Sequence, residues 1–204
     1  MSRDVDDLRG VPVRRVLIVG GPGSGKTTVA RTVAARLRLP HHDLDRLAYD
    51  PPAAQAEAPF WRWERVRDDL RRERAAALAA TEDWVAEGLY AGWTAALRDA
   101  ADVIFWLDLP TPVTMWRVVR RAIAHRCRGG RDWDIRSAVR VARGARAYRT
   151  RPSATEDDLR ERDGANGTRT LEAFLRPVAR KVVRCRTDEG VRRAVESLSG
   201  ADSA

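Results

Sequence analysis

The sequence predicts a three-layer α/β domain in which a parallel sheet lies between helices. Short continuous apolar runs, such as residues 16–19 and 103–107, are typical of parallel strands that are buried on both faces. Segments with helical spacing follow these runs, and strands that alternate with helices indicate a parallel sheet. The chain has 204 residues and a mass of 22.8 kDa, which is enough for one hydrophobic core without metals or disulfides.

The composition excludes an integral membrane protein and a disulfide scaffold. The hydrophobic fraction is 44%, the mean hydropathy is −0.47, and no apolar run approaches the roughly 20 residues of a membrane span. The first residues are acidic and lack the apolar stretch of a signal peptide. Cys127 and Cys185 are too few for a disulfide framework or a zinc cluster. We therefore expect a cytoplasmic protein that has no membrane partner.

The net charge of +9 comes almost entirely from arginine, because Lys26 and Lys181 are the only lysines among 38 basic residues. This arginine bias weakens the charge as evidence for a nucleic-acid partner. It also makes Lys26 informative, since a compact ammonium stands where the chain would ordinarily use a planar guanidinium.

The pattern along the chain predicts strands at 16–19, 41–45, 84–86, 103–107 and 181–185. It predicts helices at 26–37, at about 60–80, from 111 to the Gly129-Gly130 break, at 134–148 and at 188–198. Residues 152–168 are polar and contain two glycines, which predicts an exposed loop or a mobile insertion. Residues 1–13 and 200–204 are predicted as flexible tails, so a single domain spans 14–199.

Gly20 to Thr27 match the pattern G-x-x-x-x-G-K-[ST] at every fixed position, directly after a strand and before a helix. Glycines let successive backbone N–H groups surround a phosphate, and the helix N-terminus adds its positive end. A glycine-rich turn that only connects two elements is the weaker interpretation, since both the motif and its context match. We predict that the loop binds a nucleoside triphosphate through Gly21, Pro22, Gly23, Ser24, Gly25, Lys26, Thr27 and Thr28, with the Thr27 hydroxyl on Mg²⁺.

Carboxylates follow the predicted strands at Asp43 and Asp45, at Glu87 and at Asp108. Ligands of doubly wound sheets gather at the carboxyl ends of the strands. There a carboxylate can hold Mg²⁺ or its waters, and another can orient the hydroxyl of a phosphoryl acceptor. Each of these residues could equally be a solvated strand end or a helix cap, so their roles stay open on the residues alone.

Arginines gather after the fourth strand. Arg117 and Arg121 are four residues apart and share one helix face, and further arginines surround Gly129-Gly130. Guanidinium groups suit phosphate binding and base stacking, although a solvated helix face is the alternative. A cluster that runs into a double glycine is what a closing lid would need, so about 125–168 is assigned to a lid and insertion.

These stretches together resemble the adenylate-kinase-like P-loop kinases, and most closely the DNA topology modulation kinases. The resemblance rests on the P-loop, on 42–45, on 84–90, and on 101–110 with Arg117 and Arg121. It covers most of 15–130, whereas about 131–175 matches poorly.

The resemblance implies a P-loop NTPase fold with a five-stranded parallel sheet in the order 2-3-1-4-5 and an arginine-rich lid. It implies that Asp45 faces the acceptor, that Arg117 stacks on the nucleotide base, and that Arg121 contacts the transferring phosphates. Glu87 stands where such kinases usually have Asp, contacting Mg²⁺ through water. Asp108 belongs to a turn that is structural in the family, and it is the second choice for the metal.

We therefore predict an ATP-dependent phosphotransferase that moves the γ-phosphoryl group to a small acceptor, namely a nucleotide, a nucleoside or another metabolite. The predicted catalytic residues are Lys26, Asp45, Arg117 and Arg121, and the predicted metal ligands are Thr27 and Glu87. The alternative is a nucleotide-gated binding or regulatory ATPase, which could associate with DNA. The positive net charge favours this alternative, whereas the absence of a DNA-reading motif argues against it. The sequence does not decide the acceptor, ATP against GTP, or monomer against homodimer.

Overall fold

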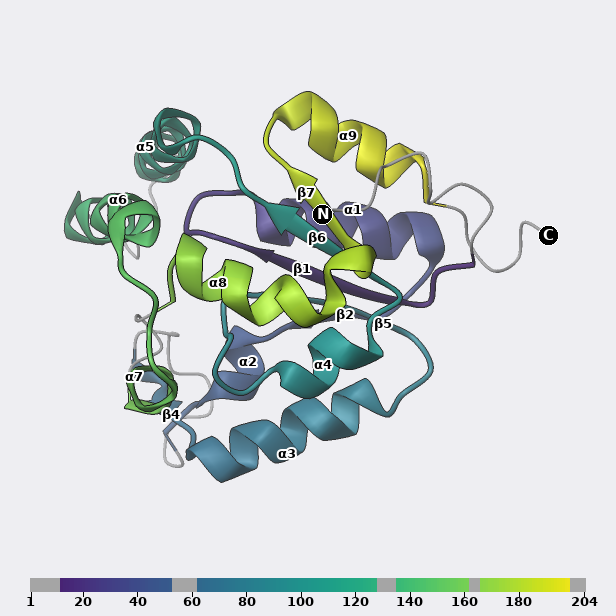
Figure 1. The fold of residues 1–204 in the computed structure, drawn as a ribbon. Coiled ribbons are helices and arrows are strands. Elements are labelled where there is room, and N and C mark those ends of the chain that lie inside the picture. The colour runs from purple at the N-terminus through teal and green to yellow at the C-terminus, as the bar shows by residue number, and fades with distance from the viewer. Residues whose placement is uncertain (1–11, 53–61, 128–134, 162–165, 199–204) are drawn as a thin grey trace.

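A five-stranded parallel sheet forms the centre of the computed structural model, which describes residues 12–52, 62–127, 135–161 and 166–198 (Figure 1). Its order is β2-β5-β1-β6-β7, which confirms the predicted 2-3-1-4-5 order of the core strands. Every neighbouring pair in this sheet is parallel. The strands are β1 (Arg15–Gly20), β2 (His41–Asp43), β5 (Trp84–Gly88), β6 (Val103–Leu107) and β7 (Val182–Cys185).

Alternate residues of β1 enter two separate cores, which makes the fold three-layered. Val16 and Ile18 pack on the side that carries α1 (Lys26–Leu37) and α9 (Asp188–Glu196). Leu17 and Val19 pack on the opposite side, which is covered by α3 (Asp68–Ala79), α4 (Ala95–Ala100) and α8 (Thr168–Leu175). The central strands are therefore apolar on both faces, as a parallel sheet requires.

Two helices lie side by side beyond the carboxyl ends of the strands: α5 (Thr111–Cys127) and α6 (Ile135–Thr150) (Figure 1). The short helix α7 (Glu156–Glu161) follows them. Of the helices in the described ranges, none is long and apolar enough to cross a membrane. Both helices contact the loop between β1 and α1, because Gly23 lies against Thr114 of α5 and Gly21 lies against Tyr148 of α6.

Several local predictions are wrong. The helix expected from about 60 begins at Asp68, and β4 (Glu64–Arg65) instead pairs antiparallel with β3 (Tyr49–Asp50). The second strand ends early because Asp43 Oδ1 accepts a hydrogen bond from the Asp45 amide, which starts α2 (Asp45–Ala48). The helices α4 and α8 and the 3₁₀ segment η4 (Arg176–Lys181) were not expected, since such short helices depend on tertiary packing.

The predicted boundaries also need correction. Val13, assigned to the flexible tail, is 2% exposed and belongs to the core that contains Val16. The segment 152–168, expected to be an exposed loop or a mobile insertion, contains the helix α7 and the buried Asn166, which is 4% exposed. Residues 1–11, 128–134 and 199–204 lie outside the described ranges, and so does the Gly129-Gly130 break.

Candidate active site

Two glycines give the loop between β1 and α1 a left-handed backbone at two positions. Gly23 and Gly25 have φ values of +77° and +92°, a region that other residues rarely adopt. No side chain caps α1, and its first turn holds no acidic residue. The positive end of α1 is therefore not neutralised from within the described chain, which suits an anion.

A cavity of about 380 Å³ lies beside this loop. Its walls come from the P-loop, from the ends of β2 and β5, from the second half of α6 and from the segment before α8. The lining residues are Pro22, Lys26, Thr27, Asp43, Asp45, Glu87, Gly88, Leu89, Tyr90, Gly144, Tyr148, Arg151 and Asn166. Five predicted site residues thus line one cavity: Pro22, Lys26, Thr27, Asp45 and Glu87.

The remaining predicted phosphate-binding residues belong to the loop or, in the case of Thr28, to the first turn of α1. Gly21, Gly23, Ser24, Gly25 and Thr28 are not among the lining residues. The Ser24 hydroxyl is buried and has no hydrogen-bond partner in the described chain. The Ser24 backbone carbonyl, by contrast, accepts a hydrogen bond from Arg117.

Lys26 lies among acidic side chains. Its Nζ donates a hydrogen bond to the Gly21 carbonyl at 3.4 Å. Burial lowers the pKa of Lys26, whereas the charges of Glu87, Asp45 and Asp43 act to raise it. With these three carboxylates around one ammonium, the site would favour a divalent cation together with bound phosphates.

Glu87 and Thr27 provide oxygen atoms that fit Mg²⁺. Glu87 is 3% exposed; burial raises its pKa, and a hydrogen bond with Thr27 acts in the opposite direction. Carboxylate and hydroxyl oxygens are ligands that Mg²⁺ accepts. Within the described ranges, no group of three or more His, Cys, Asp or Glu could hold a metal ion alone. These residues therefore fit an ion that is held jointly with substrate phosphates.

Asp108 does not line the cavity and has a different environment. It is 4% exposed, and its Oδ2 lies 2.7 Å from Arg184 Nη2. Its Oδ1 lies 3.1 Å from Arg149 Nη2. A carboxylate already paired with two arginines is a poor metal ligand, so the arrangement supports a structural role that ties α6 and β7 to the end of β6.

Asp45 is held in the cavity wall by a tyrosine. Tyr90 Oη donates a hydrogen bond to Asp45 Oδ1 at 2.5 Å. The Tyr90 ring lies 5.0 Å, between centroids, from the ring of the buried Trp93. The position of Tyr90 is fixed by this aromatic packing, and that of Asp45 by the hydrogen bond.

Arg117 contacts the P-loop from outside the cavity. Its Nη1 donates to the Ser24 carbonyl at 2.9 Å, and its Nη2 donates to Asp188 at the start of α9. A Cβ added at Gly25 would lie 3.0 Å from Arg117 Nη1. Base stacking by Arg117 stays a prediction. The Arg121 side chain lies outside what the structure describes, so its role stays a prediction as well.

Sequence reasoning missed the residues that come from the assigned lid region. Gly144, Tyr148 and Arg151 belong to α6 or follow it directly, and Asn166 precedes α8; all four line the cavity. Tyr148 is the only aromatic residue in α6, which is otherwise rich in alanine and arginine. No local period relates such a residue to a loop more than 100 positions earlier in the chain.

No family model and no curated protein matches the sequence. Among solved structures, the chain is similar to a shikimate kinase from Acinetobacter baumannii in complex with shikimate, with 17% identity over 95% of this chain and 94% of that one and a TM-score of 0.45. It is similar to a gluconokinase from Sinorhizobium meliloti 1021, with 18% identity over 90% of each chain and a TM-score of 0.44. A sugar kinase from Janibacter sp. HTCC2649 has 19% identity over 83% of this chain and 99% of that one, with a TM-score of 0.39.

Proposed function

We propose that the protein transfers the γ-phosphoryl group of ATP, with Mg²⁺, to a hydroxyl group of a small molecule. The observation that carries this proposal is the single cavity that collects Lys26, the Thr27–Glu87 pair and Asp45. Groups suited to a phosphoryl donor and a group suited to an acceptor therefore share one space, as direct transfer requires.

The donor side consists of the P-loop and the metal ligands. Lys26 and the backbone N–H groups at the start of α1 would hold the phosphates, and Thr27 and Glu87 would hold Mg²⁺. The chemistry that Mg²⁺ would supply there is positive charge, which would offset the negative charge of the phosphates during transfer. Arg117, against the outer side of the loop, would contact the nucleotide base.

The acceptor side centres on Asp45. Its carboxylate would accept the proton of the acceptor hydroxyl, while the acceptor oxygen forms a bond to the γ-phosphorus. The bond between that phosphorus and the β–γ bridging oxygen breaks, and ADP leaves with its electron pair. The proton then passes from Asp45 to water. Because α6 lies over the loop with Tyr148, it would limit the access of competing water.

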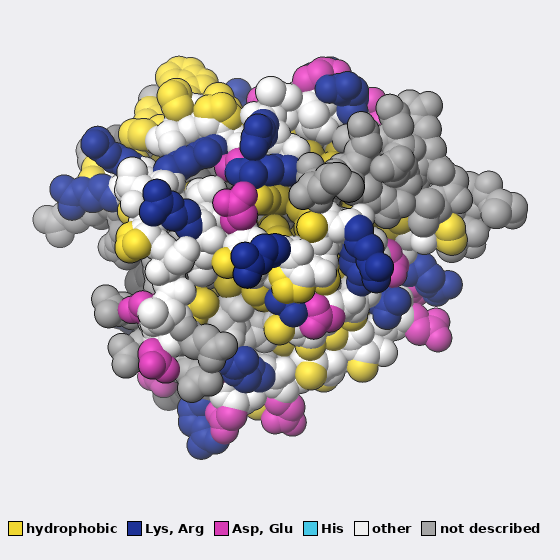
Figure 2. All heavy atoms as spheres, viewed as in Figure 1, with side chains coloured by type: hydrophobic (Ala, Val, Ile, Leu, Met, Phe, Trp, Pro, Cys, Tyr) yellow, Lys and Arg dark blue, Asp and Glu magenta, His cyan; other side chains and the backbone are white. Residues whose placement is uncertain are grey.

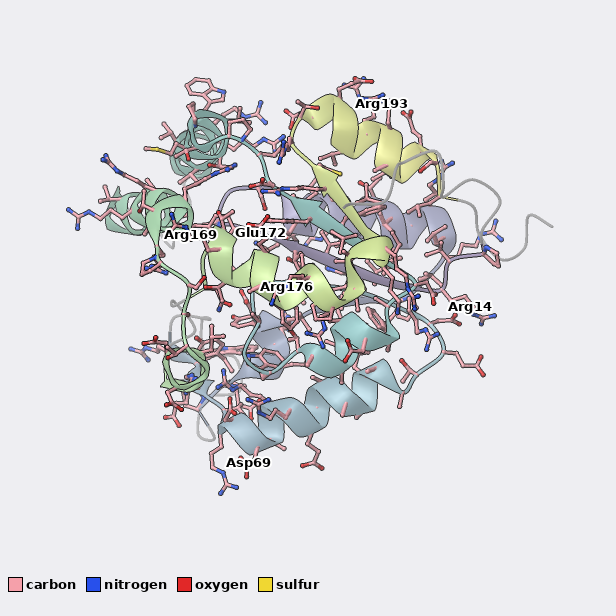
Figure 3. The ribbon with its side chains drawn as sticks, in the orientation of Figure 1. Arg14, Asp69, Arg169, Glu172, Arg176 and Arg193 are labelled. Atoms are coloured by element: carbon pink, nitrogen blue, oxygen red, sulfur yellow. The ribbon has the colours of Figure 1, made fainter. Side chains whose placement is uncertain are left out.

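A DNA-associated regulatory ATPase is less well supported. The basic side chains are scattered over the visible face among acidic ones, and they form no continuous stripe there (Figure 2). Arg169 on α8 and Arg176 at the start of η4 lie on either side of Glu172 (Figure 3). A nucleic-acid surface would gather its positive charge on one face or along one helix. The resemblance of the sequence to the DNA topology modulation kinases in particular remains a prediction.

The test uses the two lysines of the chain. Lys26→Ala is expected to lower ATP-dependent phosphorylation by about 10²–10³-fold, because the donor-side charge is lost. Lys181→Ala is the matched control, since Lys181 Nζ bonds to the Asp99 carbonyl at the surface. The acceptor is sought by following labelled γ-phosphate over nucleosides, nucleotides and small alcohols. Unchanged turnover in Lys26→Ala, with its circular dichroism spectrum intact, would contradict the proposal.

A second measurement addresses the alternative. Binding to DNA through phosphates weakens steeply with salt. Salt-sensitive DNA binding at two ionic strengths, together with no phosphorylated acceptor in the screen, would favour the regulatory ATPase.

A further inference from the structure

Arg151 lies at a fixed place in the cavity wall. It directly follows α6, and its backbone N–H donates to the Ala147 carbonyl at 2.9 Å. Gly167, before α8, lies against it: a Cβ added at Gly167 would be 3.1 Å from Arg151 Cβ and 3.1 Å from the Tyr148 carbonyl. The two segments are therefore in tight contact, and this contact positions the start of the Arg151 side chain at the cavity wall.

The Arg151 guanidinium has no hydrogen-bond or ion-pair partner among the residues that the structure describes. Other half-buried arginines do have one: Arg74 pairs with Asp50 at 2.8 Å, and Arg149 pairs with Asp108 at 3.1 Å. Arg151 is unpaired although three carboxylates line the same cavity. A partly buried cation without a counter-ion is a place where the charge of a ligand is stabilising.

A chain of contacts connects Arg151 to the acceptor side of the cavity. Asn166, next to Gly167, accepts a hydrogen bond from the Ala91 amide through its Oδ1 at 3.0 Å. Ala91 follows Tyr90, the residue that holds Asp45. Arg151 therefore belongs to the wall that carries the predicted acceptor carboxylate, whereas the P-loop forms the donor side.

We infer that the phosphoryl acceptor carries an anionic group, a carboxylate or a phosphate, that Arg151 binds while the acceptor hydroxyl faces Asp45. This inference rests on the proposed kinase function. A guanidinium presents donors in a planar fork that matches either anion, so the shared chemistry is one bidentate contact. Asp45 and Arg151 together then select a hydroxylated anion and reject its neutral analogue.

The test compares matched acceptors. Wild-type protein is assayed with aliphatic hydroxy acids against their amides, and with nucleoside 5′-monophosphates against their nucleosides. A hydrogen bond to a charged group corresponds to a preference of about 10- to 100-fold for the anionic member. A preference within the first set of pairs identifies a carboxylate as the bound group, and within the second set a phosphate.

Variants of Arg151 assign the preference to this side chain. Arg151→Gln is expected to abolish the preference and to raise the KM for the acceptor, with the KM for ATP unchanged; Arg151→Lys keeps part of the preference. Arg143→Gln, at an exposed position of α6, is the control and should behave as wild type. Calorimetric titration of the ADP-loaded protein with the same compounds reads out binding where turnover is not seen.

The outcomes separate the two proposals. Equal use or binding of anionic and neutral acceptors by the wild type overturns the Arg151 inference and leaves the kinase intact. A raised KM for ATP in Arg151→Gln, with the acceptor KM unchanged, moves Arg151 to the donor phosphates and overturns the inference as well. Failure of the wild type to transfer phosphate to any acceptor, with ATP turnover unaffected by Lys26→Ala, contradicts the proposed function itself.

Discussion

The ring of Tyr148 lies directly against Gly21, so that a Cβ added at Gly21 would be 2.6 Å from Tyr148 Cδ1. Tyr148 Oη accepts a hydrogen bond from Trp106 Nε1 at 3.2 Å in the core. The ring cannot retreat without breaking this contact. Gly21 occupies a variable position of the loop motif, so the reason for its glycine is the packing of α6 and not the motif.

Gly21→Ala is therefore expected to displace Tyr148 and to lower the free energy of unfolding by about 1–3 kcal/mol, with weaker nucleotide binding. Urea unfolding measures the first effect, and an ATP titration measures the second. Gly144→Ala is the control, because its Cβ would meet Pro22 at an ordinary 3.6 Å. Combining Gly21→Ala with Tyr148→Leu should reduce the cost of Gly21→Ala; an unchanged cost in that background would show that another contact is responsible.

Asp45→Asn should impair acceptor phosphorylation far more than ATP binding. Loss of a general base costs about 10²–10⁴-fold in turnover, whereas the P-loop is untouched. Tyr90→Phe keeps the packing on Trp93 but removes the hydrogen bond to Asp45, so we expect a smaller loss of turnover. An ATP titration beside a turnover assay checks both variants. If Asp45→Asn reduces both quantities equally, or neither, Asp45 does not act on the acceptor.

Asp108→Asn is expected to destabilise the fold without changing the dependence on Mg²⁺. The substitution leaves Arg149 and Arg184 facing a neutral amide at a buried position. Removing one partner of a buried ion pair costs about 3–5 kcal/mol, which urea unfolding can detect. Turnover of the remaining folded protein should show the wild-type Mg²⁺ titration. A shifted Mg²⁺ titration here, with none in Glu87→Gln, would reverse the assignment of the metal carboxylate.

Glu87 should make the stability of the nucleotide-free protein depend on pH. Burial raises the pKa of Glu87 in the folded protein above its ordinary value of 4.5. As pH rises, the Glu87 carboxyl group therefore ionises at a lower pH in the unfolded chain than in the folded protein. The contribution of Glu87 to stability is then full below about pH 4.5 and is lost as pH rises through the raised pKa of the folded state. The unfolding free energy of the wild type, relative to Glu87→Gln, should therefore fall from acid to neutral pH.

Urea unfolding at a series of pH values, without nucleotide or metal, measures this difference. The Glu82→Gln variant, at a side chain that is 88% exposed, is the control. A difference between wild type and Glu87→Gln that rises with pH would contradict the buried environment assigned to Glu87.

The sequence alone was sufficient for the features that local pattern encodes. The P-loop is set by the spacing of a few residues, and its flanking strand and helix are contiguous with it. The buried strands appear as continuous apolar runs because both of their faces are covered, and acidic residues such as Asp45 and Glu87 could be assigned to the carboxyl edge for the same reason.

Tertiary structure alone decided which side chains complete the cavity. Tyr148, Arg151 and Asn166 reach it only because α6 and the start of α8 pack across the carboxyl ends of the sheet. It also separated Glu87, which faces the cavity, from Asp108, which two arginines bind. The physical reason is that such contacts join residues far apart in the chain, where neither the period of a helix nor the spacing of a motif specifies which side chain meets which.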